Sequence, residues 1–401
     1  MAGVTRWDAV VVGAGPAGSA TALLLARAGA RVLMLDRARF PRDKPCSEYL
    51  SPETTRVLER LGGGVLEAVA ASSHARLTGM KVVAPSGRSM TGRFADRFSF
   101  ALPRTRFDAI LRGAAEAAGA VVREGVKVED LVYDGGAVGG VVTRDSGCGM
   151  RDACHARVVV GADGLRSVVA RRFGRVRSSL PRRVAFTAHV ADVAGVTDLG
   201  EMHVGRAGYV GLGPIGGGVT TVALVVPVRG MKGRPDFFPA LEQFPGLAGR
   251  FDPRRMVRDI LATGPFAQWS RRPVAPGGGA LLVGDAADFF DPFTGQGIYS
   301  ALRGAELAAA CLIPALSHGV SGSVPHAALQ SYARARRREF TGKWLLERLI
   351  GLGVGWPALV ERVVGRLARR ADLADLLVRA TGNCVPARAV LAPGVLAGLL
   401  W

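Results

Sequence analysis

The chain has few cysteines, few lysines and few aromatic residues, and no apolar run that could cross a membrane without interruption. Its cysteines are odd in number and lack the paired spacing of a zinc site or a disulfide framework. We therefore expect a reduced, cytoplasmic protein with no bound metal. An apolar strand pattern begins almost at once, so we expect no signal peptide. The cysteines are Cys46, Cys148, Cys154, Cys311 and Cys384.

Acidic residues are also scarce. The chain has 33 Asp and Glu against 52 Lys and Arg, which gives a formal net charge of +19. Nucleic-acid binding would require a basic stripe with interleaved aromatic residues or a known reading module, and the sequence shows neither. We expect no nucleic-acid partner. A basic surface instead suits an anionic substrate, cofactor or lipid surface.

The longest apolar segment is the tail at residues 385–401, which prolines, glycines and an arginine interrupt. It is too broken to span a bilayer, so we expect no transmembrane segment. Three alternatives remain for this tail: packing on the body of the protein, covering a substrate channel, or peripheral contact with a membrane.

Residues 8–36 carry the most informative pattern: an apolar strand, a glycine turn, a helical run and a second strand that ends in an acid. Gly13 permits the sharp turn, Gly15 lets the backbone approach a pyrophosphate, and Gly18 lets the helix pack close to the strand. The helix N-terminus then presents free N–H groups to the phosphates. Asp36 ends the second strand, where a carboxylate accepts from ribose hydroxyls. The segment predicts a dinucleotide-binding βαβ unit.

Two later segments repeat the order of apolar strand, Gly/Asp turn and helix. Their turns lie at residues 161–164 and 284–297. From about 176 to 276 the pattern changes to alternating apolar and polar residues, which is typical of an antiparallel sheet. Because doubly wound sheets bind ligands at the carboxyl ends of parallel strands, we expect the three turns to form one site.

These patterns predict an α/β protein with a doubly wound, Rossmann-like parallel sheet, an inserted antiparallel-sheet domain and a helical C-terminus. The expected nucleotide-binding domain is discontinuous and comprises residues 1–75, 103–175 and 277–320. The expected substrate-binding sheet comprises residues 76–102 and 176–276, and the helical region comprises residues 321–401.

The three turns in this order, with an aspartate in the second and third, resemble those of the flavoprotein monooxygenase and geranylgeranyl reductase superfamily. The resemblance covers residues 8 to about 315 and extends to the aromatic hydroxylases. It implies a GR2-type FAD-binding domain, with FAD bound in an extended form and its adenine half on the first βαβ unit. It also implies that the chain is an FAD-dependent oxidoreductase.

The resemblance implies roles for single residues. Arg104 contacts FAD, Val128 meets the adenine through its backbone, and Asp285 binds near the ribityl chain. The helix that begins at Gly297 points at the isoalloxazine ring, where its N-terminus stabilises the negative charge of the reduced form. The cofactor-binding residues implied are Gly13, Gly15, Pro16, Ala17, Gly18, Asp36, Arg37, Cys46, Ser47, Tyr49, Arg104, Val128, Asp163, Gly164, Asp285, Pro292, Gly295, Gly297 and Ile298.

The chain departs from the family's patterns in two places. Geranylgeranyl-reductase-like members have a Cys-Gly-x-Gly-Leu loop against the flavin, whereas this chain has Cys-Ser-Glu-Tyr-Leu at residues 46–50. Those reductases also have a Tyr-x-Trp-x-Phe-Pro segment, which here becomes Tyr-Val-Gly-Leu-Gly-Pro at residues 209–214. The tryptophan-halogenase signature Trp-x-Trp-x-Ile-Pro is absent. These departures weaken the assignment as a prenyl reductase.

The same FAD framework serves several reactions, so the residues leave the reaction open. The favoured interpretation is a flavin monooxygenase that hydroxylates a hydrophobic aromatic or polyketide-like molecule of bacterial secondary metabolism. The alternatives are a reductase of isoprenoid C=C bonds, and a flavin-dependent halogenase or redox-neutral cyclase. The catalytic candidates are Tyr49, His203 and Tyr209. His189, His203 and Tyr209 are the acid/base residues that we expect near the substrate.

The electron donor is open as well. The sequence has no second complete GxGxxG motif, which argues for transient docking of NAD(P)H or for a separate reductase. The expected partners are therefore a hydrophobic small-molecule substrate and, in addition, a carrier protein or an electron-donor protein.

Overall fold

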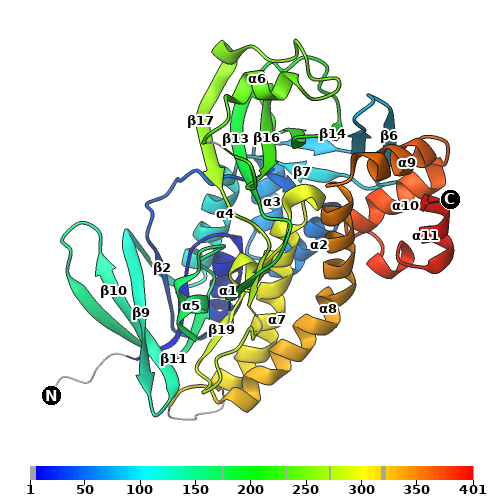
Figure 1. Ribbon diagram of the computed structural model, residues 1–401. Helices are drawn as coiled ribbons and strands as arrows, with labels where there is room; N and C mark the ends of the chain where they lie inside the picture. The colour runs from blue at the N-terminus through cyan, green and yellow to red at the C-terminus, as the bar shows by residue number, and fades with distance from the viewer. Residues whose placement is uncertain (1–5, 174–175, 232, 271, 318–321, 401) are drawn as a thin grey trace.

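The computed structural model describes residues 6–173, 176–231, 233–270, 272–317 and 322–400. Two large sheets lie at different ends of the molecule, and the C-terminal helices flank both of them (Figure 1). The predicted combination of a parallel sheet, an antiparallel sheet and C-terminal helices is confirmed.

The first sheet is the doubly wound one. Its strands run in the order β8-β2-β1-β11-β10-β9, and β19 also pairs with β11. The pairs β1–β2, β1–β11, β2–β8 and β11–β19 are parallel, whereas β9, β10 and β11 pair antiparallel. The bounds are β1 Arg6–Val12, β2 Val32–Asp36, β8 Val121–Glu124, β9 Val126–Asp134, β10 Ala137–Asp145, β11 Arg151–Gly161 and β19 Ala280–Leu282.

Helices cover both faces of this sheet, which explains why β1 and β11 are apolar and buried toward their carboxyl ends. Helices α1 (Pro16–Arg27), α4 (Arg104–Ala117) and α7 (Gly297–Ser317) pack on one face, and α5 (Val168–Phe173) packs on the other. Among the described residues α7 alone has the length and hydropathy of a membrane span. It runs between α1 and α8 in the core.

The second sheet has seven strands in the order β17-β13-β16-β15-β14-β5-β6. One of its faces packs on helix α6 (Phe237–Glu242), and the other lines a cavity. Strands β13 to β16, which lie in residues 176–276, pair antiparallel in the order β13-β16-β15-β14, as the sequence predicted. Only β14 and β5 pair parallel among the described strands of this sheet. The bounds are β5 Gly79–Val83, β6 Ser89–Arg93, β13 Arg183–Ala191, β14 Leu199–Gly205, β15 Gly208–Pro214, β16 Val219–Pro227 and β17 Met256–Thr263.

Some elements differ from the sequence prediction. β4 (Ala75–Leu77) and β7 (Ser99–Ala101) pair with β3 (Tyr49–Leu50) in a small separate sheet, so they do not extend the large second sheet. Another small sheet joins β12 (Val176–Ser178), β18 (Gln268–Ser270) and β20 (Asp288–Phe289). These strands are two or three residues long, too short for a periodic pattern to reveal their partners.

The C-terminal region is helical and closes over the second sheet. Helix α8 (His326–Gly353) runs beside α7, and a short non-helical segment separates it from α9 (Pro357–Leu367). The other C-terminal helices are α10 (Ala371–Thr381) and α11 (Pro393–Leu400). Helices α2 (Pro52–Leu61) and α3 (Val65–Ala71) precede the second sheet in the sequence. The apolar tail packs on the body, and Val390 and Leu396 line the cavity.

Candidate functional site

The three glycine turns meet at one edge of the first sheet. A Cβ added at Gly13 would lie 2.5 Å from the carbonyl oxygen of Ala162, so the first and second turns are in contact. A Cβ added at Gly284 would lie 2.9 Å from Cβ of Ala17, which joins the third turn to the first helix. Parallel pairing of β1, β11 and β19 produces this meeting, because it brings their carboxyl ends to the same edge.

The acid at the end of β2 fixes the first turn. Asp36 is buried, and its Oδ2 accepts a 2.8 Å hydrogen bond from the backbone N–H of Ala14, while Oδ1 accepts one from Ala38. Val128 lies in β9, whose beginning is joined to the end of β2 by a hydrogen bond from Gly125 to Ala38. These segments form the end of the site where the resemblance places adenosine, and Arg37 is exposed there.

Three basic side chains face the glycine turns. Nη2 of Arg42 and Nη2 of Arg104 lie 3.5 and 3.8 Å from the position of a Cβ on Gly15. Nζ of Lys44 lies 3.1 Å from that position on Gly164. Three cations at the first two turns suit the two negative charges of a pyrophosphate.

Acidic neighbours hold these cations in place. Asp108 is fully buried and accepts two hydrogen bonds from Arg104, at 2.7 and 2.8 Å, and it also forms an ion pair with Arg42 at 3.1 Å. Burial opposes the charge of Arg104, but Asp108 raises the pKa of its guanidinium above the ordinary value. Burial lowers the pKa of Lys44 and raises that of Asp285, while the attraction between these two groups opposes both shifts.

Lys44→Met is expected to weaken FAD binding about tenfold, because it removes one charge-assisted contact to the pyrophosphate. The loss should shrink as the salt concentration rises, since salt screens the charge that the variant lacks. Titration of the FAD-free protein, followed by flavin fluorescence at two salt concentrations, measures both effects. Lys127→Met removes an exposed lysine on the β9 strand and serves as the control. Equal affinities of the two variants at low salt would contradict the role of Lys44.

Asp163 carries an oxygen atom that has no hydrogen-bond partner in the part of the chain that the structure describes. Its Oδ2 accepts a 2.6 Å hydrogen bond from Val168 at the start of α5, whereas its buried Oδ1 accepts none from the described residues. Burial raises the pKa of this carboxyl above its ordinary value. A buried, unpaired acceptor beside the glycine turns is consistent with a ligand that donates a hydrogen bond there.

The third turn leads into α7. Helix α7 begins at Gly297, as the sequence predicted, and Gly295 lies two residues before it. The 3₁₀ turn Pro292–Thr294 precedes it, and Asp291 caps this turn by accepting from the N–H of Phe293. Gln296 donates to the carbonyl of Thr381 and thereby ties the helix start to α10.

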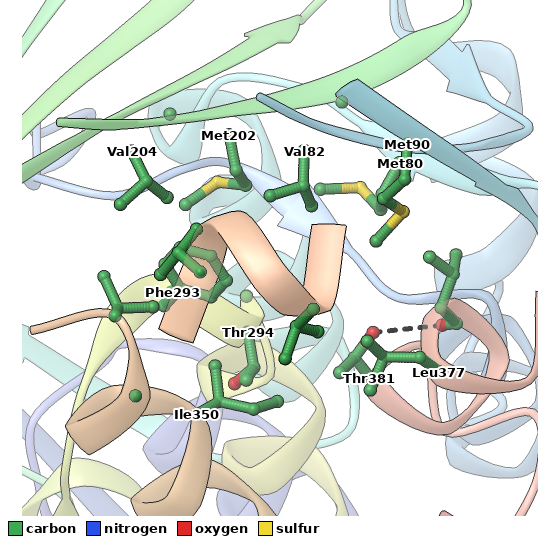
Figure 2. A pocket seen from close by; sticks show the side chains of 18 of the residues that line it. Met80, Val82, Met90, Met202, Val204, Phe293, Thr294, Ile350, Leu377 and Thr381 are labelled. Carbon is green, nitrogen blue, oxygen red and sulfur yellow. Dashed lines mark hydrogen bonds between the residues drawn. The ribbon is translucent and has the colours of Figure 1, made fainter. Parts of the chain in front are cut away.

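A cavity of about 390 Å³ lies between the third turn, the second sheet and the C-terminal helices. Figure 2 shows Met80, Val82 and Met202 pointing from the sheet toward Phe293 and Ile350 on the other side. No charged side chain and no histidine lines the cavity among the described residues. Its few polar side chains are the hydroxyl groups of Ser47, Tyr49, Thr221, Thr294 and Thr381.

The structure separates the catalytic candidates. Tyr49 lines the cavity, and burial raises the pKa of its hydroxyl well above the ordinary value. The hydroxyl of Tyr209 instead donates a 2.6 Å hydrogen bond to Asp291, and its ring packs edge-on against Phe293. Tyr209 is fully buried in this network and does not line the cavity.

His203 points away from the cavity. Its neighbours on β14, Met202 and Val204, line the cavity, whereas its own Nδ1 donates to the carbonyl of Pro245 on the α6 side. The expectation that His203 faces the substrate is therefore wrong, because strand residues alternate between the two faces. Its Nε2 contacts Glu201, which also accepts two hydrogen bonds from Arg250.

The Glu201 contacts predict a pH dependence of stability. Burial alone would raise the pKa of Glu201, but Arg250 and His203 lower it from 4.5 to about 2. Because the folded-state pKa is the lower one, Glu201 stabilises the fold above pH 4.5, and this contribution disappears as the pH falls toward 2. Glu201→Gln is therefore expected to be less stable than the parent at pH 7, with a difference that shrinks between pH 4.5 and 2. Urea unfolding across this range, with the exposed Glu59→Gln as control, measures the difference. A difference independent of pH would contradict this account.

Sequence reasoning missed two of the three cations and one acid. Residues 40–52 form a loop with several charged residues, among them Arg42 and Lys44. Membership of this charged loop was the only sequence feature that pointed to these two cations. Glu48 lies between two residues that line the cavity, and it is completely buried. Its Oε2 accepts a 2.5 Å hydrogen bond from Nε2 of His189, and its Oε1 lies 3.6 Å from Arg258.

The departures from the resembled patterns face the same cavity. Ser47 and Tyr49 line it from the loop, where the reductases have glycines, and Tyr49 packs on Gly295 and stacks on Phe94. Gly211 and Gly213 line it from β15, where those reductases have Trp and Phe. Relative to that pattern, aromatic bulk has moved from the sheet to the loop. The Met202 side chain approaches Gly211, whereas a Cβ on Gly213 would meet only Thr221, at 3.8 Å.

Comparison with known proteins decides the family. The FAD binding domain family matches residues 6–342. The chain belongs to this family. The menaquinone reductase of Mycolicibacterium smegmatis is 31% identical over 95% of this chain and 92% of its own length. The digeranylgeranylglycerophospholipid reductase of Methanosarcina acetivorans is 28% identical over 84% of this chain and 81% of its own.

The fold is shared beyond the reductases. The structure of a myxobacterial chondrochloren halogenase superposes with a TM-score of 0.75 at 24% identity, over 85% of this chain and 82% of its own. Membership of the family makes this chain an FAD-dependent oxidoreductase. The glycine turns, the three cations and the unpaired oxygen of Asp163 fit the cofactor. When bound, FAD supplies the hydride or electron transfer, and the protein supplies position and exclusion of water.

Proposed function

We propose that this protein is an FAD-dependent reductase that saturates a C=C bond in the isoprenoid chain of a lipid. The cavity is the observation that carries the proposal. It begins at Ser47, Tyr49 and Gly295, against the segments assigned to the flavin, and it extends to Leu349 at the surface of α8. Its volume lies in the range of about 300–1,000 Å³ that small-molecule sites occupy.

The chemistry of the cavity supports a hydrocarbon occupant. Burial of an apolar chain among methionine, leucine and valine side chains stabilises the complex by roughly 25 cal/mol per Å². A substrate with several polar groups would lose hydrogen bonds to water there, because the lining offers only a few hydroxyls in return. The names of two relatives, a menaquinone reductase and a digeranylgeranylglycerophospholipid reductase, favour the same substrate class.

Hydroxylation of an aromatic molecule, which the sequence favoured, is the second candidate. A hydrophobic ring also fits an apolar cavity, and the halogenase fold neighbour shows that the scaffold accommodates other flavin chemistry.

In the proposed reductase, the two-electron reduction of the alkene consumes one hydride and one proton per double bond. Burial raises the pKa of the Tyr49 hydroxyl, so this lining residue stays protonated at neutral pH. NAD(P)H or a separate donor protein restores the reduced cofactor.

An anaerobic assay separates the two candidates. The FAD-loaded protein is reduced with dithionite and mixed with a digeranylgeranyl phospholipid, and products are followed by mass spectrometry. A mass gain of two hydrogens per reduced bond without oxygen is the expected result. Oxygen consumption that requires an aromatic substrate, with no anaerobic product from the alkene, would overturn the proposal. Replacing dithionite by NADPH or NADH in the same assay tests whether the protein accepts a nicotinamide directly.

Gly213→Phe is expected to raise KM for a long isoprenoid substrate at least tenfold. A Cβ at this position meets only a Thr221 methyl group, at 3.8 Å, so the added ring enters the cavity and occupies substrate space. FAD content and thermal stability should stay at the parent values. Gly113→Phe, on the helix α4 where a Cβ meets nothing within 4 Å, is the matched control. An unchanged KM in Gly213→Phe would show that the substrate lies elsewhere.

A further inference from the structure

The C-terminal half of α8 and the turn after it expose a row of large apolar side chains. Leu345, Leu349 and Leu352 are 49%, 45% and 56% exposed, and Trp356 is 70% exposed. Spacing of three or four residues places the three leucines on one side of the helix. We name these four residues the apolar ridge. Exposed apolar rows of this kind mark interaction surfaces.

The ridge has a basic surrounding. Exposed Arg334 and Arg338 precede Leu345 by eleven and seven residues, on the same side of α8, and Arg348 is exposed beside the ridge. The two acids of α8 do not offset these charges at the surface. Glu339 is bound to Arg303 and Glu347 to Lys343, and neither acid is exposed.

The ridge is continuous with the cavity. Leu349 belongs to both, because it is exposed at the surface and also lines the cavity with Leu346 and Ile350. Leu349 is therefore the point at which the ridge and the cavity meet. A substrate that enters there passes from one apolar surface to another.

We propose that the apolar ridge docks on an anionic lipid bilayer, so that the substrate enters the cavity directly from the membrane. Leucine and tryptophan side chains insert into the boundary between headgroups and acyl chains, and flanking arginines attract anionic headgroups. A second copy of this chain fits less well, because it would bring a second set of arginines to the same contact and no exposed acid of α8 to pair with them. The substrate part of this inference rests on the proposed function, whereas the docking part does not.

Flotation with lipid vesicles tests the docking. The full-length, FAD-loaded protein is mixed with vesicles of phosphatidylcholine alone or with 30% phosphatidylglycerol. Binding to the anionic vesicles is expected, and Leu352→Ser/Trp356→Ser should weaken it at least tenfold. The control Met150→Ser/Val257→Ser removes two similarly exposed apolar side chains far from α8 in the sequence, and it should bind as the parent does. Both double variants should retain FAD and thermal stability.

Tryptophan quenching adds a readout at the ridge itself. Brominated lipids should quench part of the tryptophan fluorescence of the parent, and Trp356→Phe should remove that part while leaving flotation intact. Absence of parent binding to anionic vesicles would overturn the docking. So would equal losses in both double variants, or a dimer in light scattering that the ridge substitutions dissociate. If the protein binds vesicles but reduces no alkene anaerobically, only the proposed function fails. If it reduces detergent-dispersed alkene but binds no vesicles, only the docking fails.

Discussion

Gly18→Ala is expected to weaken FAD binding at least 100-fold. Gly18 lies in the first turn of α1, and a Cβ there would lie 1.8 Å from the carbonyl oxygen of Gly13. The obstacle is backbone, so no side-chain rotation relieves the clash, and α1 must move away from β1. The N–H groups at the start of α1 would then leave the pyrophosphate position. A 100-fold loss corresponds to about 2.8 kcal/mol.

Titration with FAD, followed by flavin fluorescence, measures this loss. Gly113→Ala provides a matched control, because Gly113 lies inside α4 and a Cβ there meets nothing within 4 Å. That variant is expected to bind FAD normally and to be more stable by about 0.5–1 kcal/mol, since alanine has the higher helix propensity. If Gly18→Ala bound FAD as tightly as Gly113→Ala does, the close approach of α1 to β1 would not matter for the cofactor.

The first turn could be predicted from the sequence because its requirements are local. Only glycine fits where Gly18 meets the Gly13 backbone, so the glycine spacing in the sequence directly indicates the close approach of the helix to the turn. The start of α7 at Gly297 was predictable because the preceding turn needs a glycine: Gly295 has a φ of 65°. The order of three such turns along the chain was then enough to give the doubly wound sheet and its single site.

Contacts between distant segments were not predictable. Alternation along a strand defines two faces, but it does not tell which face meets the cavity. His189 contacts Glu48, and His203 on its own strand points to the α6 side. Arg42 and Lys44 belong to a loop without periodicity, and only the folded chain brings them to Gly15 and Gly164. Conversely, the substitutions at residues 47–50 and 209–214 became interpretable only when both were found at one cavity.

Glu48 is the residue whose importance the sequence concealed most. It is fully buried, and its carboxylate contacts three groups from three separate elements: His189, Arg258 and the backbone N–H of Arg104. Its backbone has a φ of 60°, a left-handed conformation that costs a non-glycine residue roughly 1–2 kcal/mol. The contacts of the carboxylate therefore hold a strained loop residue in place between Ser47 and Tyr49, which line the cavity.

Glu48→Ala is expected to lower the free energy of unfolding by about 3–5 kcal/mol, because it leaves the buried Arg258 and His189 without their shared carboxylate. We expect a loss near the lower end of this range, because Asp43 remains 3.4 Å from Arg258 and still pairs with it. Urea unfolding measures the loss, and Glu116→Ala, which removes a surface ion pair with Arg112, should change stability by less than about 1 kcal/mol. Glu48→Gly separates strain from charge: it removes the same contacts but relieves the left-handed backbone, so it should be about 1 kcal/mol more stable than Glu48→Ala. Equal stability of Glu48→Ala and Glu116→Ala would mean that the buried carboxylate does not hold the loop.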